Sequence, residues 1–331
     1  MQSAKKPTSK LTSRPIFALT TGDEDGIGLE VTLKALKKNP LKSSSLIVFT
    51  GDKLRRNDLK SLLSICHLSA TTLAEAISIA KASKNKLIIH LASPEAPAKW
   101  VEQAARACME KKLSGIITGP LSKTGIKQSG IKDMGHTEIL KRISGAKAVH
   151  MSFVGKEFSV VLATGHLALK DVAHHIHFKS LSDALLNSRR LLAALPRANQ
   201  KKPLAILGLN PHAGESGLLG EFEGAVFPAI LDFAKENGLK AVGPLVPDAA
   251  FLPQTRSAYS LYIALYHDQG LIPFKTIHGQ DGVHISLGLP FVRTSVDHGT
   301  AKDIFGKNKA DPTSMKSAIE WAERLVLYSK S

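Results

Sequence analysis

The chain reads Tyr266-His-Asp-Gln-Gly-Leu-Ile-Pro-Phe-Lys275 and then Gly282-Val-His-Ile-Ser-Leu-Gly-Leu-Pro-Phe-Val-Arg-Thr-Ser-Val-Asp-His-Gly-Thr300. These two stretches set His, Asp, Lys and Arg between glycines and prolines. Gly and Pro fix sharp turns, and polar groups held on turns beside a rigid scaffold commonly form binding sites. Two similar islands lie upstream, Ala163-Thr-Gly-His166 and Gly208-Leu-Asn-Pro-His-Ala-Gly-Glu215. We therefore expect several separate strand ends to build one site.

Around these islands, short apolar runs alternate with segments of helical periodicity. The pattern predicts strands at 15–20, 45–50, 86–91, 114–118, 158–164 and 203–209, and helices at 29–38, 71–82, 99–110, 180–195, 223–237 and 311–330. Periodicity does not decide between strand and buried helix at 259–266. Such alternation favours an α/β protein with a parallel sheet covered by helices, whose ligands bind where the strands end.

The bulk composition excludes several classes of protein. With 331 residues, 43% hydrophobic and 22% charged, the chain is typical of a globular protein, and it has no apolar run long enough to span a bilayer. Its two cysteines, Cys66 and Cys108, have no metal-like spacing and suggest no disulfide framework, so we expect a cytoplasmic location. The segment 1–14 is basic and is predicted to be a disordered tail.

The net charge of +16 has three interpretations: nucleic-acid binding, attraction of an anionic small molecule such as a phosphorylated or carboxylated substrate, or a generally basic proteome. Nucleic-acid binding is the weaker interpretation, because the positive residues are scattered and aromatic residues make up only 5% of the chain. Five residues in glycine-rich turns are candidates for holding a phosphate or carboxylate, with Arg giving a bidentate match: Lys123, His136, Thr137, Lys275 and Arg293.

Three histidines, His166, His212 and His267, each lie at or just beyond a strand-like run. A single histidine in such a place is more often structural, but three in the same position indicate a divalent metal site. Asp248 and Asp268 are candidates for metal ligation, for orienting a histidine, or for proton transfer, although Asp248 also suits a simple turn.

Familiar nucleotide-binding and hydrolase motifs find little support. Gly26-Ile-Gly28 follows a strand as a dinucleotide fingerprint does, but Val31 occupies the place of the third glycine. This weak signal is better explained as a tight turn. The sequence has neither a Gly-x-Ser-x-Gly elbow nor a Walker loop, so a hydrolase triad or an NTPase is not indicated.

Taken together, the islands resemble the 4-hydroxythreonine-4-phosphate dehydrogenase family of pyridoxal 5′-phosphate biosynthesis, from Ile16 to the end of the chain. The motifs that carry the resemblance are Gly119-Pro120 with Lys123, Gly135-His-Thr-Glu138, Ala163-Thr-Gly-His166, Leu209-Asn-Pro-His-Ala-Gly-Glu215, Tyr266-His-Asp-Gln-Gly270 and Leu287-Gly-Leu-Pro-Phe-Val-Arg-Thr-Ser-Val-Asp-His-Gly-Thr300. Several long motifs in the right order make this resemblance specific.

The resemblance implies a homodimer with a two-domain α/β/α fold similar to isocitrate and isopropylmalate dehydrogenases. The active site would lie in the interdomain cleft at the dimer interface. We expect one domain to comprise 15–135 plus 290–331, and the second, with the metal ligands and dimer contacts, to comprise 136–289. A divalent ion (Zn²⁺, Mg²⁺ or Co²⁺) would be bound by His166, His212 and His267.

The resemblance also assigns the remaining site residues. The substrate would contact His136, Thr137, Lys275, His284 and Arg293. NAD would lie near Asn210, Gly214, Gly217, Leu287 and Ser295, and the choice of NAD over NADP is carried by the resemblance alone. The proton acceptor would be Asp248 or Lys275.

The activity that the resemblance implies is an NAD- and metal-dependent oxidation and decarboxylation of 4-phosphooxy-L-threonine to 3-amino-2-oxopropyl phosphate. The sequence departs from the family at His284, where Asn is usual, at Gly165, where Thr is usual, and in the acidic loop 20–26. Two alternatives therefore stay open. One is a sister dehydrogenase acting on D-threonate or D-erythronate 4-phosphate, and the other is a non-catalytic metal- and phosphate-binding protein.

Overall fold

The computed structural model describes residues 14–38, 41–279 and 281–328, so the predicted tail, apart from Arg14, lies outside the described residues. The strands are β1 (Ile16–Thr20), β2 (Ser45–Gly51), β3 (Leu68–Ala70), β4 (Ile88–Ser93), β5 (Gly115–Thr118), β6 (His150–Val154), β7 (Ser159–Leu162), β8 (Leu204–Leu207), β9 (Ala241–Leu245), β10 (Tyr262–Ala264), β11 (Val283–Leu287) and β12 (Val292–Val296). Within these ranges, all of them join one 12-stranded sheet in the order β3-β4-β2-β1-β5-β12-β11-β6-β7-β10-β8-β9.

The helices are α1 (Gly28–Lys37), α2 (Arg56–Leu63), α3 (Leu73–Ala82), α4 (Pro97–Met109), α5 (Lys123–Gln128), α6 (His136–Ser144), α7 (Leu169–His175), α8 (Phe178–Ala194), α9 (Arg197–Gln200), α10 (Phe222–Glu236), α11 (Pro247–Ala250), α12 (Pro253–Arg256), α13 (His267–His278) and α14 (Thr313–Tyr328), with short 3₁₀ turns η1 (Pro211–Gly217) and η2 (Lys302–Ile304). The elements predicted from the sequence are all present, with ends shifted by a few residues, and residues 329 and 330 of the predicted helix 311–330 lie outside the described residues. The undecided segment 259–266 contains the strand β10.

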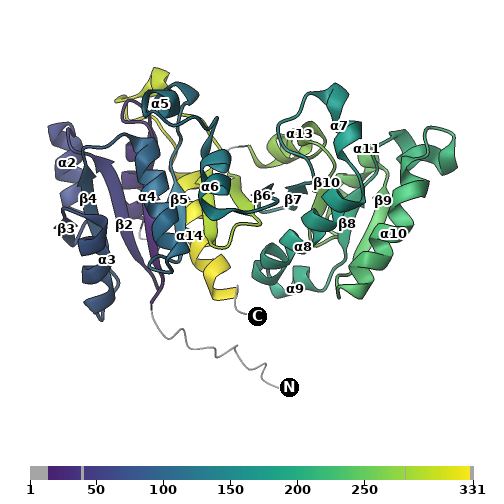
Figure 1. The fold of residues 1–331 in the computed structure, drawn as a ribbon, viewed down its shortest axis with the longest axis horizontal. Helices are drawn as coiled ribbons and strands as arrows, with labels where there is room; N and C mark the ends of the chain where they lie inside the picture. Colours follow the sequence, from purple (N-terminus) through teal and green to yellow (C-terminus); the bar gives the residue numbers. More distant parts are fainter. Residues whose placement is uncertain (1–13, 39–40, 280, 329–331) are drawn as a thin grey trace.

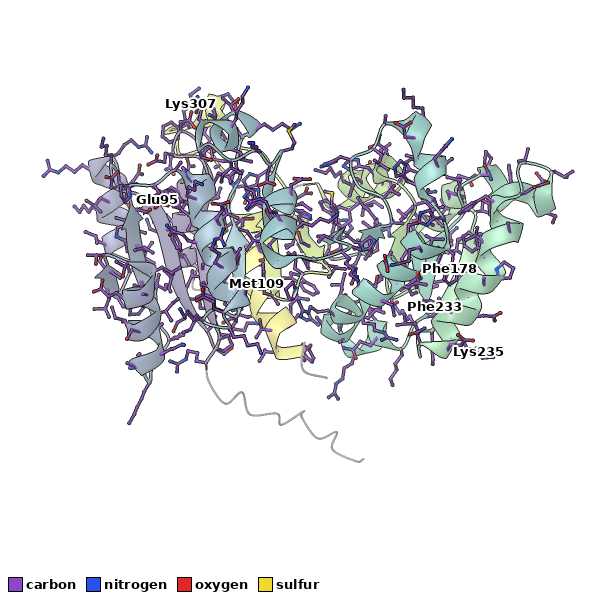
Figure 2. All side chains as sticks on the ribbon, in the orientation of Figure 1. Glu95, Met109, Phe178, Phe233, Lys235 and Lys307 are labelled. Atoms are coloured by element: carbon purple, nitrogen blue, oxygen red, sulfur yellow. The ribbon has the colours of Figure 1, made fainter. Side chains whose placement is uncertain are left out.

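Helices cover both faces of the sheet (Figure 1). Along β1, Phe17 and Leu19 belong to one buried cluster and Ile16 and Ala18 to another. Alternate residues of a strand point to opposite faces, so a strand that is apolar at every position must be buried on both. In the second half of the sheet, Phe178 of α8 packs edge-on against Phe233 of α10, with ring centroids 5.5 Å apart (Figure 2).

The sheet is mixed, which the alternation of strands and helices did not predict. β3, β4, β2, β1, β5 and β12 pair in parallel, and so do β7, β10, β8 and β9. Between them, β11 pairs antiparallel with β12 and β6, and β6 pairs antiparallel with β7. Three successive reversals leave the two parallel blocks running in opposite directions. The expected division into domains at 135/136 and 289/290 stays a prediction.

A short turn explains the first reversal. Only residues 288–291 separate β11 from β12, and strands joined by so short a connection must pair antiparallel. Gly288 has a φ of +94°, and a Cβ there would approach the Ala148 carbonyl oxygen to 2.1 Å. The turn therefore requires glycine. This hairpin joins the two parallel blocks.

The end of the chain completes the first block of the sheet. β12 pairs with β5, and the helix that follows, α14, packs beside β12 and α1. From α14, the buried Glu323 accepts hydrogen bonds from the backbone N–H groups of Lys42, Ser43 and Ser44 at 2.8 to 3.1 Å. One carboxylate therefore fastens the last helix to the entrance of β2. In the described residues, no helix is long and apolar enough to cross a membrane.

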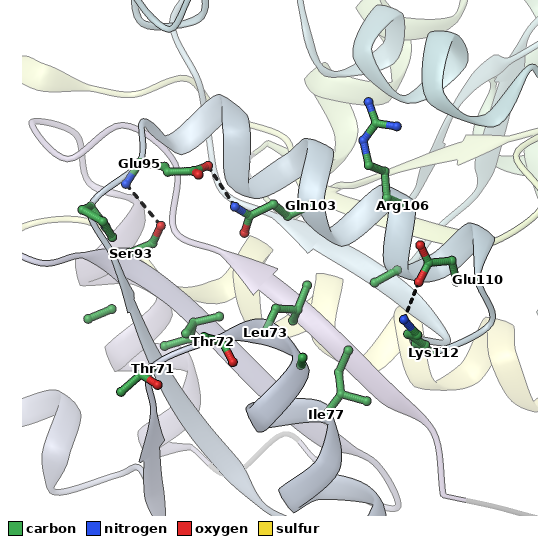
Figure 3. A pocket seen from close by; sticks show the side chains of 15 residues that line it. Thr71, Thr72, Leu73, Ile77, Ser93, Glu95, Gln103, Arg106, Glu110 and Lys112 are labelled. Carbon is green, nitrogen blue, oxygen red and sulfur yellow. Dashed lines mark hydrogen bonds and ion pairs between the residues drawn. The ribbon is translucent and has the colours of Figure 1, made fainter.

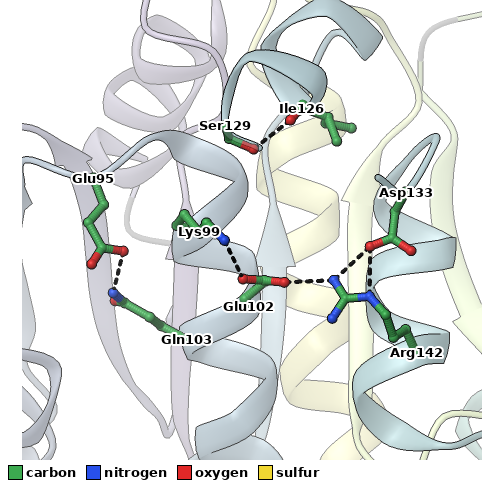
Figure 4. A network of polar contacts seen from close by, with 8 residues as sticks. All are labelled: Glu95, Lys99, Glu102, Gln103, Ile126, Ser129, Asp133 and Arg142. Atoms are coloured by element: carbon green, nitrogen blue, oxygen red, sulfur yellow. Dashed lines mark hydrogen bonds and ion pairs between the residues drawn. The ribbon is translucent and has the colours of Figure 1, made fainter. Parts of the chain in front are cut away.

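An ionic network fixes α6 against α4 (Figure 4). The Arg142 guanidinium contacts Asp133 and Glu102, each at 2.6 Å, and Lys99 also reaches Glu102 at 3.2 Å. Asp133 precedes α6, Arg142 is on α6 and Glu102 is on α4. The network therefore positions the beginning of α6, which the site uses.

We expect Arg142→Met to lower the free energy of unfolding by about 1 kcal/mol, because it removes two contacts of a guanidinium that is itself 45% exposed and therefore screened. Lys112→Met is the matched control, since among the described residues Lys112 forms an ion pair only with Glu110, and both side chains are 55% exposed. This control should cost less than about 0.5 kcal/mol. Urea denaturation measures both, and equal midpoints for the two variants would contradict the assignment.

Candidate active site

Arg293 lies at the centre of the site, buried in β12 with 2% of its surface exposed. Its Nη1 donates to His284 Nδ1 at 3.0 Å and to Ser286 Oγ at 3.1 Å, and its Nη2 donates to Thr118 Oγ1 at 2.8 Å. All three acceptors are neutral. In the described part of the chain, no carboxylate forms an ion pair with it, and burial lowers its pKa to about 9. The protein thus buries a cation without a counter-anion, which is costly unless a ligand supplies one.

The hydrogen bond from Arg293 fixes the state of His284. A guanidinium has no acceptor, so His284 Nδ1 must accept, and the proton of the neutral ring sits on Nε2. The pKa of His284 is well below its ordinary value because of burial and the nearby charges of Arg293, His136, His166 and Lys275. His284 is therefore a neutral donor that faces the site through Nε2.

Polar atoms without partners gather around Arg293. Seven buried side-chain nitrogen or oxygen atoms lack a hydrogen-bond partner among the described residues. Five of them belong to this region: Arg293 Nε, His136 Nε2, His284 Nε2, Asp297 Oδ2 and His298 Nε2. Buried polar groups in folded proteins nearly always have partners, so a group of unsatisfied atoms indicates where a polar ligand binds.

The amino-terminal end of α6 faces the same place. α6 begins at His136, and its N-cap Gly135 makes no side-chain capping bond, so the first backbone N–H groups of the helix suit an anion. Burial and the charge of Arg293 lower the pKa of His136 to about 3, so its ring is neutral. Thr137 follows on the same first turn. Figure 1 shows α6 and α13 on opposite sides of the junction between the two blocks.

Lys275 of α13 supplies a second cation. Its Nζ lies 3.0 Å from Asp297 Oδ1, and the Asp297 side chain is only 8% exposed. Burial raises the pKa of Asp297, and the contact with Lys275 partly offsets this. Lys275 therefore joins His136, Thr137, His284 and Arg293 in one region, which we call the clamp.

Two of the predicted metal ligands lie side by side. The rings of His166 and His267 have centroids 5.2 Å apart. His267 Nδ1 contacts Asp268 Oδ1 at 2.7 Å, an arrangement that leaves Nε2 for an ion. Burial, followed by the charge of His267, lowers the pKa of His166. Two adjacent imidazoles in this arrangement fit a divalent cation.

His212 does not join this pair in the structure. It lies exposed in η1, where residues 212–216 all have positive φ angles. The described residues contain no group of three or more His, Cys, Asp or Glu side chains placed to hold a metal ion. The structure thus brings together two of the three histidines.

A buried glutamate shapes the loop that contains η1. Glu223 of α10 accepts from the backbone N–H groups of Leu209 and Asn210 at 2.8 Å, and from Asn210 Nδ2 at 2.9 Å. Gly214 has a φ of +79°, and a Cβ there would lie 2.7 Å from Glu223 Oε2, so a larger residue would be strained at this position. Asn210 and Gly214, two of the residues expected near NAD, therefore also maintain the loop.

The other expected cofactor and acid–base residues are dispersed. Gly217 is exposed, with a φ of +98°, and a Cβ there would meet no described atom within 4 Å. Leu287 and Ser295 are buried in the central hairpin, where Ser295 Oγ donates to the Thr118 carbonyl oxygen at 3.1 Å. Asp248 is exposed on α11.

Four groups of the site were not predicted from the sequence: Thr118, Ser286, Asp297 and His298. Asp297 and His298 lie inside the motif that ends at Thr300, and their position after an apolar strand was an available signal. Thr118 and Ser286 act as acceptors for Arg293 through strand pairings that local sequence does not reveal.

The structure shows an α/β fold in which Arg293 and His284 lie on the hairpin between two blocks of one sheet. The fold alone is similar to a beta-decarboxylating dehydrogenase of Thermococcus kodakarensis, with a TM-score of 0.50, 12% identity and coverage of 95% and 94% of the two chains. The chain belongs to the family described as Pyridoxal phosphate biosynthetic protein PdxA, which matches residues 42–322.

Individual relatives agree with this assignment. A 4-hydroxythreonine-4-phosphate dehydrogenase of a Sulfurihydrogenibium species is 38% identical over 92% of this chain and 97% of its own. A D-threonate 4-phosphate dehydrogenase of Bordetella bronchiseptica is 32% identical over 94% and 93%. The crystal structure of a 4-hydroxythreonine-4-phosphate dehydrogenase from Burkholderia phymatum is similar with a TM-score of 0.75, 29% identity and coverage of 94% and 98%. Membership of a dehydrogenase family implies a nicotinamide cofactor.

The neutral His136 predicts a pH dependence of stability. Its pKa falls to about 3 from an ordinary value of 6.5, so between these values the unfolded chain binds more protons than the folded one. The free energy of unfolding should therefore fall as the pH is lowered below about 6.5, with His136 contributing up to about 2 kcal/mol between about pH 7.5 and about pH 5.

Urea denaturation at these two pH values measures the effect. His136→Gln should reduce the difference between them, whereas His174→Gln, at an exposed position on α7, should leave it unchanged. The same difference in His136→Gln and in the unsubstituted protein would show that His136 is not held neutral.

Proposed function

We propose that the protein oxidises 4-phosphooxy-L-threonine with NAD and decarboxylates the product to 3-amino-2-oxopropyl phosphate. The observation that carries this proposal is the buried Arg293, which has no acidic partner among the described residues and lies in a chain of the PdxA family. The substrate alcohol gives a hydride to NAD⁺ and releases a proton. The resulting β-keto acid then loses CO₂ and takes up a proton at carbon.

The clamp would bind the two anionic groups of the substrate. Arg293 and the first turn of α6, with His136 and Thr137, suit a phosphate or carboxylate, because they combine a full charge with backbone N–H donors. His284 Nε2–H adds a neutral donor. Since the binding groups are fixed by the hairpin and by α6, they can hold the reacting carbon in one orientation.

Lys275 is the better placed of the two candidates for proton transfer. Its Nζ lies beside the buried Asp297, and its charge acts on His284, so it belongs to the clamp. Asp248 is exposed on α11 and, within the described part of the chain, makes no hydrogen bond or ion pair with a clamp residue. We therefore propose Lys275 Nζ as the proton acceptor, which requires the amine to give up its own proton before it takes the proton of the reacting hydroxyl.

His166, His267 and His212 would hold a divalent cation, Zn²⁺, Mg²⁺ or Co²⁺. The fit rests on the adjacent rings of His166 and His267 and on the contact of His267 with Asp268. An ion bound there supplies Lewis acidity, which favours the deprotonated hydroxyl and stabilises negative charge on oxygen. His212 would have to approach from η1.

We propose NAD, rather than NADP, near Asn210, Gly214, Gly217, Leu287 and Ser295. We also propose a cytoplasmic homodimer whose second copy covers the site. Exposed apolar side chains next to the histidine pair support this, since Leu167, Leu169 and Ile272 are 39%, 74% and 64% exposed. The two cysteines are free thiols, as suits a reducing compartment.

NADH formation from NAD and 4-phosphooxy-L-threonine tests the proposal. Turnover should stop with a chelator and return with added Zn²⁺, Mg²⁺ or Co²⁺. His267→Ala and His212→Ala should each lower kcat/KM by at least about 100-fold. His174→Ala, which removes an exposed histidine of α7, should retain full activity. Full activity of chelated His267→Ala protein would refute the metal assignment.

A second candidate is oxidation of D-threonate 4-phosphate, favoured by the similarity to the Bordetella bronchiseptica enzyme. His284 is the residue to examine, because it touches Arg293 and differs from the Asn usual in the family. If this candidate is correct, the protein should turn over D-threonate 4-phosphate with the higher kcat/KM. His284→Asn should then shift the ratio toward 4-phosphooxy-L-threonine by about tenfold. An unchanged ratio would remove His284 as the specificity residue.

A further inference from the structure

A cavity of about 520 Å³ lies behind the central hairpin, away from the clamp. Its lining includes Asn187, Arg189 and Arg190 of α8, Ser144 at the end of α6, Leu289 in the turn between β11 and β12, and Tyr328 at the end of α14. None of the described residues that line it is Asp or Glu. The cavity is large enough for a small organic ligand.

Arg190 is the main charged group of this cavity. It is partly buried, and its Nη1 donates to the Leu289 carbonyl oxygen at 3.3 Å, a long bond to a neutral acceptor. In the part of the chain that the structure describes, no carboxylate forms an ion pair with Arg190. Burial lowers its pKa. The group therefore carries charge in a poorly solvated place and has N–H donors to spare.

Other groups near the cavity leave its charge positive. Arg189 donates to the Asn237 side-chain oxygen at 3.3 Å and to the Asn237 carbonyl oxygen. Asn237 is the C-cap residue of α10. The carboxyl ends of α6 and α14 add partial negative charge, of about half an elementary charge each. Two full guanidinium charges outweigh these dipoles.

A second cavity of similar size, about 500 Å³, shows the contrast (Figure 3). It lies between α3 and α4, and its charged groups are matched. Lys112 pairs with Glu110 at 2.6 Å, and Gln103 donates to Glu95 at 2.8 Å. Arg106 is its one other cation, so two carboxylates face two basic groups. The lining of this cavity therefore favours neither an anionic nor a cationic ligand.

We propose that the cavity behind the hairpin binds a small organic anion, with a phosphate or carboxylate group taken by Arg190 and an apolar portion resting on Leu289 and Ala193. Asn187 maintains the wall of the cavity, because its Nδ2 contacts His150 Nδ1 at 3.0 Å and the Ala148 carbonyl oxygen at 3.4 Å. Oxygen anions match the planar donor groups of a guanidinium. The site is distinct from the clamp and does not depend on the proposed reaction. One wall of it is the turn of the hairpin that carries His284 and Arg293.

Isothermal titration calorimetry at low ionic strength tests the site with two probes, inorganic pyrophosphate and citrate. The unsubstituted protein should show a binding component that Arg190→Gln weakens by at least about tenfold. Arg190→Lys should retain most of it, and Arg189→Gln should weaken it less. Arg106→Gln, which removes one cation from the matched cavity, should bind as the unsubstituted protein does. Binding of pyrophosphate alone identifies phosphate as the preferred group, and binding of citrate alone identifies carboxylate.

The proposal is overturned if Arg190→Gln titrates like the unsubstituted protein with both anions, because all binding then belongs to the clamp. It is also overturned if Arg106→Gln loses as much affinity as Arg190→Gln, since net charge alone would then explain the binding. Circular dichroism establishes that each variant is folded. If Arg190→Gln does not fold, unchanged affinity in Arg189→Gln overturns the proposal.

Discussion

The antiparallel pairing of β11 with both β12 and β6 is the constraint on which the rest of the molecule depends. It joins two parallel blocks that run in opposite directions, and it does so through a turn that only glycine can make at position 288. Arg293 and His284 lie on the two strands of this hairpin, so their contact is fixed by strand register. Thr118, which accepts a hydrogen bond from Arg293, comes from β5, which pairs with β12. The clamp is therefore built from the sheet itself, and side chains from α6 and α13 approach it from either side.

The charge of the clamp is concentrated on few groups. His136 and His284 stay neutral because they are buried beside a cation, so the positive charge comes from Arg293 and Lys275. Neutral imidazoles can donate hydrogen bonds without adding repulsion between cations. Lys275 is partly compensated by Asp297, whereas Arg293 has only neutral partners among the described residues. An entering anion would meet its strongest attraction at the most deeply buried charge.

Several residues of the candidate site, and the burial of both faces of the sheet, could be predicted from the sequence. Residues such as His284, Arg293 and His267 could be identified because they lie between the Gly and Pro residues that form turns. Polar side chains in such places often belong to binding sites. The covered sheet followed from runs that are apolar at every position, such as Ile16 to Leu19. Strand direction could not be inferred, because the decisive feature is a turn of four residues whose partners, such as Ala148, are distant in sequence. The roles of Thr118 and Ser286 depend on the same pairings. His212 lies in a run of residues with left-handed backbone angles, and this run follows the two backbone N–H groups that Glu223 binds. The local sequence does not predict this conformation.

The fastening of α14 by Glu323 has a consequence for how the protein is made. The first block of the sheet begins with β1, yet it is completed by β12 and α14 from the end of the chain. A ribosome delivers these two elements after every other element of that block. The strands β6 to β10 and their helices are continuous in sequence, so they can pair while the remainder is still being synthesised. In the amino-terminal half, one edge of β5 stays uncovered until β12 has been synthesised. The half of the polypeptide that is synthesised first is thus the half whose block of the sheet is completed last.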